Sequence, residues 1–375
     1  MNDREALIQL NLIPGLGSAT IHRLLSSFES AASIFKASPT ALKEILGRYA
    51  TEEVLNGIRS ADGNNELAKE FQRADRSGVR IITLLDSDYP ELLKNISDPP
   101  PVLYVKGTLL PEDVAAVAIV GTRSATFYGL NVAHEMAREL AQSGITVVSG
   151  LAEGIDRAAH EGSLEGSGRT LAVLGHGLNH LYPPSHQELS EEIAHSGALV
   201  SEFPIDFPPG KGNFPRRNRV IAGLSLGVVV VEAPLKSGAL ITAREALEQG
   251  REVFAVPGPV SSLKSKGTHQ LLKDGARLAE SFLDVIEELA PVLKERLSSW
   301  EKIAGPIAGE SPDLADVNRE ESIVYQAIPA AGTLTADSLT EMTALNPAKL
   351  LTLLTELELK GLIRQIPGQG YSRSR

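Results

Sequence analysis

Three arginines lie within four residues in the segment NFPRRNRVIA, residues 213–222, of a chain whose formal net charge is −11. Arg216, Arg217 and Arg219 carry planar guanidinium groups, which bind phosphate oxygens in pairs and stay charged at any working pH. Two phenylalanine–proline pairs, at residues 207–208 and 214–215, precede the cluster, and proteins that grip single-stranded nucleic acid combine such charges with aromatic rings that stack on bases. The alternative is a solvated helix start whose arginines pair with nearby carboxylates.

The composition is that of a soluble globular protein with two or three domains. Of the 375 residues, 42% are hydrophobic and 22% are charged, which is ordinary for this class. The absence of cysteine excludes disulfides and thiol nucleophiles and fits a reducing cytoplasm. The first ten residues carry charges where a signal peptide would be apolar. The apolar runs are too short to span a bilayer, so we expect a cytoplasmic protein with no membrane contact.

Short, β-branched apolar runs alternate with helical segments through the middle of the chain. Such runs are typical of strands buried on both faces, and the alternation predicts an α/β fold with a Rossmann-like, doubly wound parallel sheet. The six predicted strands are residues 114–121, 145–150, 170–177, 198–202, 226–233 and 251–258.

Four regions follow from these patterns. Residues 1–75 have helical periodicity, residues 79–290 contain the sheet, and residues 291–320 read as a charged linker. Residues 321–375 give three helical runs and a hairpin-like tail, which indicates a winged helix.

Informative residues stand where the predicted strands end. Gly121, Thr122 and Arg123 follow the first strand, and Ser149 and Gly150 end the second. In a parallel sheet these ends share one edge, where ligands bind and helix N-termini offer N–H groups to phosphate.

The sequence lacks the residue patterns of several other kinds of site. The spacing GxGxxG of a dinucleotide site and the P-loop pattern are both absent, and Ser149 is not in a nucleophile elbow. The histidines are scattered, and His176 and His180 fall in a turn with few acids nearby. We therefore expect no catalytic constellation, no metal and no cofactor, and we interpret Asp156 as a helix-terminus or arginine-pairing carboxylate.

Six blocks, in this order, resemble the DNA-processing protein A family (DprA, also called Smf). They are VAIVGTRSATFYG, VVSGLAEGIDRAAHEGSL, TLAVLGHGLNHLYPP, SEFPIDFPPGKGNFPRRNRVIAGLS, VVVVEAPLKSGALITAREALEQGREVFAVPG and GTHQLLKDGA. The resemblance is strong over residues 79–280. It extends more weakly to an N-terminal domain like a sterile alpha motif (SAM) or helix-hairpin-helix and to the C-terminal winged helix.

This resemblance implies an extended Rossmann domain that binds single-stranded DNA. It implies a homodimer that protects incoming strands and loads the RecA recombinase on them during natural transformation. Phe214 would stack on a base. The remaining residues that the resemblance places around the phosphate are Gly121, Thr122, Arg123, Ser149, Gly150, Lys211, Arg216, Arg217, Asn218 and Arg219.

Several alternatives stay open from the sequence. A phosphoribohydrolase-type enzyme would use a Gly-rich turn near Glu245, although its PGGxGT pattern is absent. A sequence-specific transcription factor would work through the winged helix, whose third helix carries too few basic residues to favour duplex reading. The turn at residues 14–17 is either a phosphate-binding hairpin or a plain glycine-capped turn. The apolar segments 238–246 and 253–259 are candidates for the dimer interface.

Overall fold

The computed structural model divides the chain into two compact units, Met1–Ser298 and Ser299–Arg375. It describes residues 1–60, 65–296, 319–328, 334–343, 345–360, 362–366 and 370–373. Within these ranges, no helix is both long and apolar enough to cross a membrane.

The first unit contains a nine-stranded sheet in the order β1-β2-β6-β5-β4-β3-β7-β8-β9. From β6 to β9 all neighbours are parallel, whereas β2 is antiparallel to both β1 and β6. The strands are β1 Val79–Thr83, β2 Val102–Gly107, β3 Ala116–Val120, β4 Thr146–Ser149, β5 Thr170–Leu174, β6 Ala198–Ser201, β7 Gly227–Val230, β8 Glu252–Ala255 and β9 Arg277–Leu278.

All six predicted parallel strands are confirmed, as is the doubly wound topology. Strand β9 was not predicted, because it has only two residues and both are exposed. A strand of that length carries no apolar run for the sequence to display.

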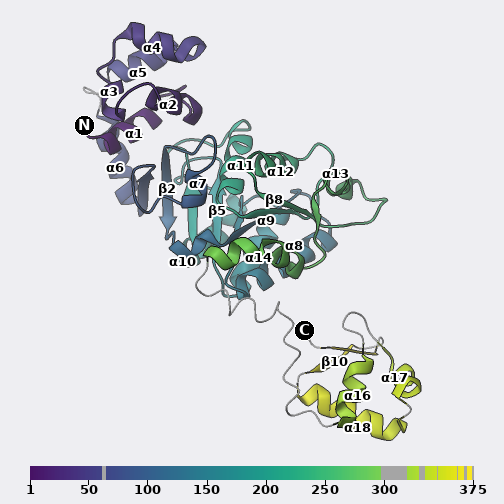
Figure 1. The fold of residues 1–375 in the computed structure, drawn as a ribbon. Coiled ribbons are helices and arrows are strands. Elements are labelled where there is room, and N and C mark those ends of the chain that lie inside the picture. The colour runs from purple at the N-terminus through teal and green to yellow at the C-terminus, as the bar shows by residue number, and fades with distance from the viewer. Residues whose placement is uncertain are drawn as a thin grey trace. The chain divides into compact units, whose positions relative to one another are not determined.

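Helices cover both faces of the sheet (Figure 1). The crossovers between β3 and β6 lie on one face, and the crossovers between β6 and β9 lie on the other, as right-handed connections require. The first face carries α8 Phe127–Gln142, α9 Ile155–Glu165, α10 Gln187–Ser196 and α14 Phe282–Arg296. The second carries α7 Glu91–Lys94, α11 Asn213–Gly223, α12 Gly238–Glu248 and α13 Lys266–Lys273.

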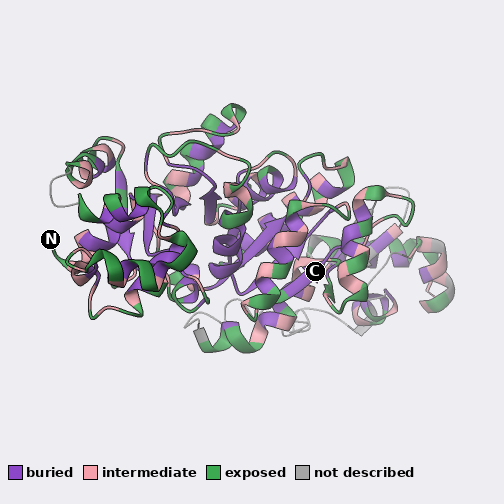
Figure 2. Ribbon diagram, turned by 90° about the horizontal axis from the view of Figure 1, so that it is seen from above, coloured by how far each residue is buried: buried purple, intermediate pink, exposed green. Residues whose placement is uncertain are grey.

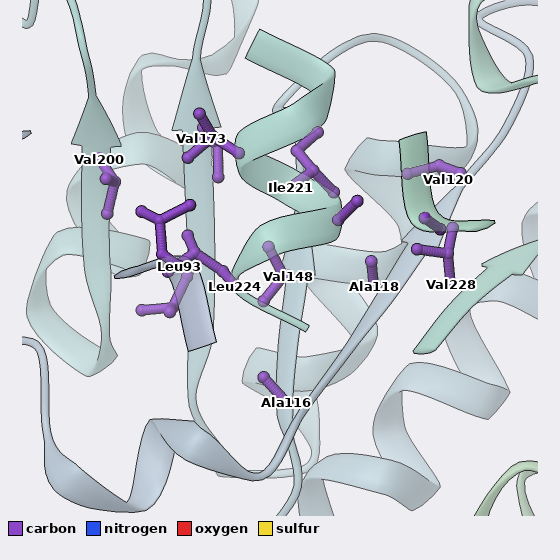
Figure 3. Close-up of a cluster of buried hydrophobic side chains, with 14 of the residues drawn as sticks. Leu93, Ala116, Ala118, Val120, Val148, Val173, Val200, Ile221, Leu224 and Val228 are labelled. Carbon is purple, nitrogen blue, oxygen red and sulfur yellow. The ribbon is translucent and has the colours of Figure 1, made fainter. Parts of the chain in front are cut away.

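Buried aliphatic side chains fill the space between the sheet and these helices. In Figure 2 the ribbon of the central strands is coloured mostly as buried. Figure 3 shows Ile221 of α11 and Leu224, which directly follows this helix, beside Val148 and Val173 of the central strands. Each such side chain contributes about 1.5–3 kcal/mol when fully buried. Ala239, Ala243 and Ala246 of α12 and Val253 of β8 belong to this core. The expectation that segments 238–246 and 253–259 form a dimer interface stays a prediction.

The N-terminal helices pack on the β1–β2 end of the same unit. Apolar residues of the helices share a core with Val79, Ile81, Val102 and Tyr104. The helical prediction is confirmed, whereas a domain boundary near residue 75 stays a prediction. The helices are α1 Asp3–Asn11, α2 Ser18–Leu25, α3 Ala31–Ile34, α4 Pro39–Leu46, α5 Glu52–Arg59 and α6 Glu66–Arg76.

The second unit has the order of a winged helix, as predicted. Three helices pack around their own apolar core and precede an antiparallel hairpin. These elements are α16 Arg319–Ala327, α17 Ala336–Thr343, α18 Pro347–Leu359, β10 Ile363–Ile366 and β11 Gly370–Arg373. Of the predicted linker, residues 291–296 are part of α14, residues 319–320 begin α16, and residues 297–318 lie outside the described residues.

Candidate nucleic-acid interface

The carboxyl edge of the sheet opens between β3 and β7. From β3 the chain winds to β4, β5 and β6 on one side, and it then returns to β7 and β8 on the other. The loops after β3 and β7 therefore diverge, and such a crevice is where open α/β sheets bind ligands. The amide of Thr122 donates to the carbonyl of Glu232 at 2.8 Å, which ties the two loops together.

A cavity of about 310 Å³ lies in this crevice. Residues from the first turns of α9, α11 and α12 line it, so three helix N-termini direct their positive dipole ends toward the same space. The predicted site residues in its lining are Gly121, Thr122, Arg123, Phe214, Arg217 and Asn218.

An exposed cation and two aromatic rings form a stack beside this cavity. The guanidinium carbon of Arg123 lies 5.1 Å from the ring centroid of Phe214. The ring centroids of Tyr182 and Phe214 lie 5.8 Å apart, and the two ring planes are tilted by 41°. Arg123 and Tyr182 are exposed, and Phe214 is half-buried. The arrangement offers flat surfaces to a base and a charge to a phosphate.

Arg217 lies deeper and contacts the backbone. Its side chain is buried and donates to the carbonyl of Gly150 at 2.7 Å and to the carbonyl of Val173, at the ends of β4 and β5. A Cβ on Gly150 would overlap the guanidinium, so only glycine permits this approach. Burial lowers the pKa of Arg217 to about 10, against the effect of the neighbouring Asp156 carboxylate, and the group stays charged at neutral pH.

Asp156 is in the first turn of α9, is buried, and interacts electrostatically with this guanidinium. Burial raises the pKa of its carboxyl, and the charge of Arg217 opposes that rise. The position agrees with the expectation of a helix-terminus carboxylate near an arginine.

The other two arginines of the cluster pair with carboxylates. Arg219 is buried and donates to Glu202 at 2.5 Å and to the Asp98 carbonyl. Arg216 lies 3.7 Å from the same Glu202 carboxylate and 5.0 Å above the ring of Phe203. Burial raises the pKa of Glu202, and both arginines oppose the rise. The cluster is therefore divided, because α11 turns Arg217 toward the cavity and the other two toward acids.

Of the remaining predicted residues, some line the cavity and others lie near it. The buried hydroxyl of Ser149 donates to the Ile119 carbonyl at 2.6 Å. Lys211 is exposed on the loop before α11, and Asn218 donates to the Gly238 carbonyl at 3.2 Å.

Two residues of this region were missed from the sequence. Tyr182 belongs to the stack, and the exposed Lys236 lines the cavity on the loop after β7. The available signal was an aromatic and a basic residue in loops that follow parallel strands.

The residues that the sequence offered for an enzyme or a metal site do not line this cavity. Glu245 faces a different cavity, described below. His176 and His180 contact backbone carbonyls of Gly177 and Asp206. The described part of the chain has no group of three or more histidine and acidic side chains placed to hold a metal ion.

Comparison with known proteins decides the family. The sequence profile described as DNA recombination-mediator protein A matches residues 80–290. The chain belongs to this family. A second profile, the DprA winged helix domain, matches residues 308–369.

Relatives cover most of the chain. It is 35% identical to protein Smf of Synechocystis sp. over 96% of both chains. It is 43% identical to protein Smf of Escherichia coli over 76% of this chain and 75% of that one. The family members thus align with both the sheet and its flanking regions.

Two solved structures are similar. DNA processing protein A from Streptococcus pneumoniae has a TM-score of 0.67 at 34% identity and covers 77% of this chain and 99% of its own. DNA processing protein A from Helicobacter pylori has a TM-score of 0.52 at 34% identity, with coverages of 58% and 98%. The latter structure is described as giving insight into that protein's single-stranded DNA binding mode.

Proposed function

We propose that this chain is a recombination mediator that binds single-stranded DNA at the carboxyl edge of its sheet. The observation that carries the proposal is the stack of Arg123, Phe214 and Tyr182 beside a cavity surrounded by three helix N-termini. A base placed on the stack gains about 1–3 kcal/mol whatever its identity. The neighbouring phosphate meets Arg123, Lys236 and helix N–H groups.

The strand so bound is protected and passed to RecA during DNA processing and natural transformation. The family description as a recombination mediator supports this role, and the protein from Helicobacter pylori supports the ligand. The protein works in the cytoplasm without catalysing a reaction. A RecA assay on strands precovered by a single-strand-binding protein tests the handover, because a mediator shortens the lag before ATP hydrolysis.

A homodimer is part of the proposal. Strand β9 forms one edge of the sheet, and Val260, Leu263 and Leu278 are exposed on the segments that follow β8. An exposed strand edge with apolar neighbours favours pairing with a second copy. Sedimentation of Leu263→Glu tests this, since a charge there should shift the protein toward the monomer.

The decisive experiment compares labelled oligo-dT with the matching duplex at two salt concentrations. The wild type should prefer the single strand with a steep salt dependence, and Arg123→Ala/Phe214→Ala should lose that preference. Duplex binding that equals or exceeds single-strand binding, and that survives both substitutions, would place nucleic-acid binding outside this site. Release of free base from a nucleoside monophosphate would instead support the phosphoribohydrolase alternative.

A further inference from the structure

A second cavity, of about 1030 Å³, adjoins the first one. It lies between residues 11–20 of the N-terminal helices and the loop that connects β6 to α11. Pro215 and Ile241 line both cavities. The two spaces therefore meet at the first turn of α11, and we refer to the second one as the hairpin groove.

The hairpin groove contains its own aromatic stack. The rings of Phe203 and Phe207 lie 5.0 Å apart with an interplanar angle of 22°. The guanidinium of Arg216 lies 5.0 Å above the first ring. Phe203 is buried in the middle, whereas Phe207 is 37% exposed and the Arg216 side chain is 46% exposed. Both outer members of the stack thus present a flat face to the groove.

The turn between α1 and α2 and the start of α2, residues 12–20, form the opposite wall of the groove. We call this turn the N-terminal hairpin. Gly17 precedes α2, and a Cβ built on it would lie 3.9 Å from the Arg216 guanidinium. The hydroxyl of Ser18 donates to the Asp98 carboxylate at 2.6 Å and holds the hairpin against the segment before β2. These contacts give the groove a wall built by the N-terminal helices.

The charges that line the groove disfavour binding of the DNA phosphates inside it. Six acidic side chains line it against four arginines, and the acids exceed the arginines by two. Arg73 pairs with Glu70 and Asp206, and Arg219 pairs with Glu202. Phosphates are therefore better placed in solvent, while bases stack on the flat groups inside.

We propose that the hairpin groove is a second base-stacking subsite for the strand that occupies the first cavity. The proposal rests on the proposed function and extends it, because it assigns the N-terminal helices a share in holding DNA. The strand passes over Pro215, and its next bases stack against Phe207 and Arg216. The continuity of the two cavities favours this occupant over a basic peptide, which the acidic lining would otherwise accept.

The test uses the full-length chain with oligo-dT of about 5 and about 20 nucleotides, lengths that span the range of known single-strand sites. Phe207→Ala should weaken binding of the long oligonucleotide about tenfold, the effect of one lost base stack, and leave the short one unchanged. Because no phosphate contact is lost, the salt dependence should stay that of the wild type. Phe207→Tyr should restore long-strand binding.

Leu247→Ala is the matched control, since Leu247 is 60% exposed and lines neither cavity. If Phe207→Ala is unstable by urea unfolding, Gly17→Leu replaces it and narrows the groove from the opposite wall. An unchanged long-strand affinity, or an equal loss for both lengths, would overturn the subsite and leave the proposed function standing. Failure of the wild type to bind either oligonucleotide would instead remove the proposed function itself.

Discussion

At the scale of single residues, two arginines on one edge of the sheet have different surroundings. Arg123 is exposed on an aromatic ring, whereas Arg217 is buried, donates to two carbonyls and interacts electrostatically with Asp156. We expect Arg217→Ala to cost about 3–5 kcal/mol of folding free energy, because it leaves a buried carboxylate without its counter-charge. Arg123→Ala should change stability by about 0.5 kcal/mol or less. Urea unfolding of both variants checks the difference.

The salt dependence of DNA binding separates the same two residues. Removing a phosphate contact lowers the slope of log K against log salt by about 0.7 for a single strand. Arg123→Ala should show this change and Arg217→Ala should not. A stable Arg217→Ala protein with the reduced slope would make Arg217 a phosphate ligand and contradict the positioning role.

A buried histidine predicts a loss of stability in acid. His160 is fully buried against the Thr170 hydroxyl at 2.7 Å, and burial lowers its pKa from 6.5 to about 3. Since the unfolded chain binds the proton first, this contribution is complete above the unfolded pKa of 6.5 and is lost as the pH falls toward 3.

Between about pH 7 and about pH 5 the loss should be roughly 2 kcal/mol. The free energy of unfolding of the wild type and of His160→Gln, measured across this range, gives the histidine's part as the difference. Equal pH dependence in the two proteins would show that His160 keeps an ordinary pKa. The comparison also cancels Asp156 and Glu202, whose raised pKa values act in the opposite direction.

At the scale of elements, the turn into α9 controls the shape of the crevice. Gly154 has φ +83° and ψ −124°, and a Cβ there would overlap the carbonyls of Thr122 and Arg123. Gly154→Ala should cost about 1–3 kcal/mol and should also weaken binding of single-stranded DNA, because the β3 loop must move.

Gly250 provides the control for backbone strain alone. It has φ +68° and open space around it, so Gly250→Ala should cost about 1–2 kcal/mol without a change in DNA affinity. Urea unfolding and oligo-dT titration of the two variants check both effects. Full DNA binding by a destabilised Gly154→Ala protein would show that the loop position does not matter.

At the scale of the whole molecule, the chain folds as two units with separate cores. The candidate site and the hairpin groove are both in the first unit. Because independent units contribute additively, a protein that ends at Ser298 should bind oligo-dT within about twofold of the full chain. A large loss of affinity on truncation would give the winged helix a direct part in DNA binding.

Much of the fold could be predicted from local patterns. The six parallel strands are continuous apolar runs, and the winged helix has three amphipathic segments before a hairpin. Each of these elements can therefore be recognised from a pattern of a few consecutive residues. Strand β9 could not be found, because two exposed residues give no such pattern. The shared core of the N-terminal helices with β1 and β2 was also invisible, since it joins residues far apart in the chain.

The sequence by itself determined the parallel sheet, and it predicted a candidate site at the strand ends and in the segment NFPRRNRV, because strand ends and residue types are local properties. Only the tertiary structure decided what each arginine does. Adjacent positions on a helix point in different directions, so Arg217 contacts strand-end carbonyls while Arg216 and Arg219 face the carboxylate of Glu202. The contact of Tyr182 with Phe214 was likewise decided by the tertiary structure. The two rings meet only because the ends of β5 and β6 lie at one edge of the sheet.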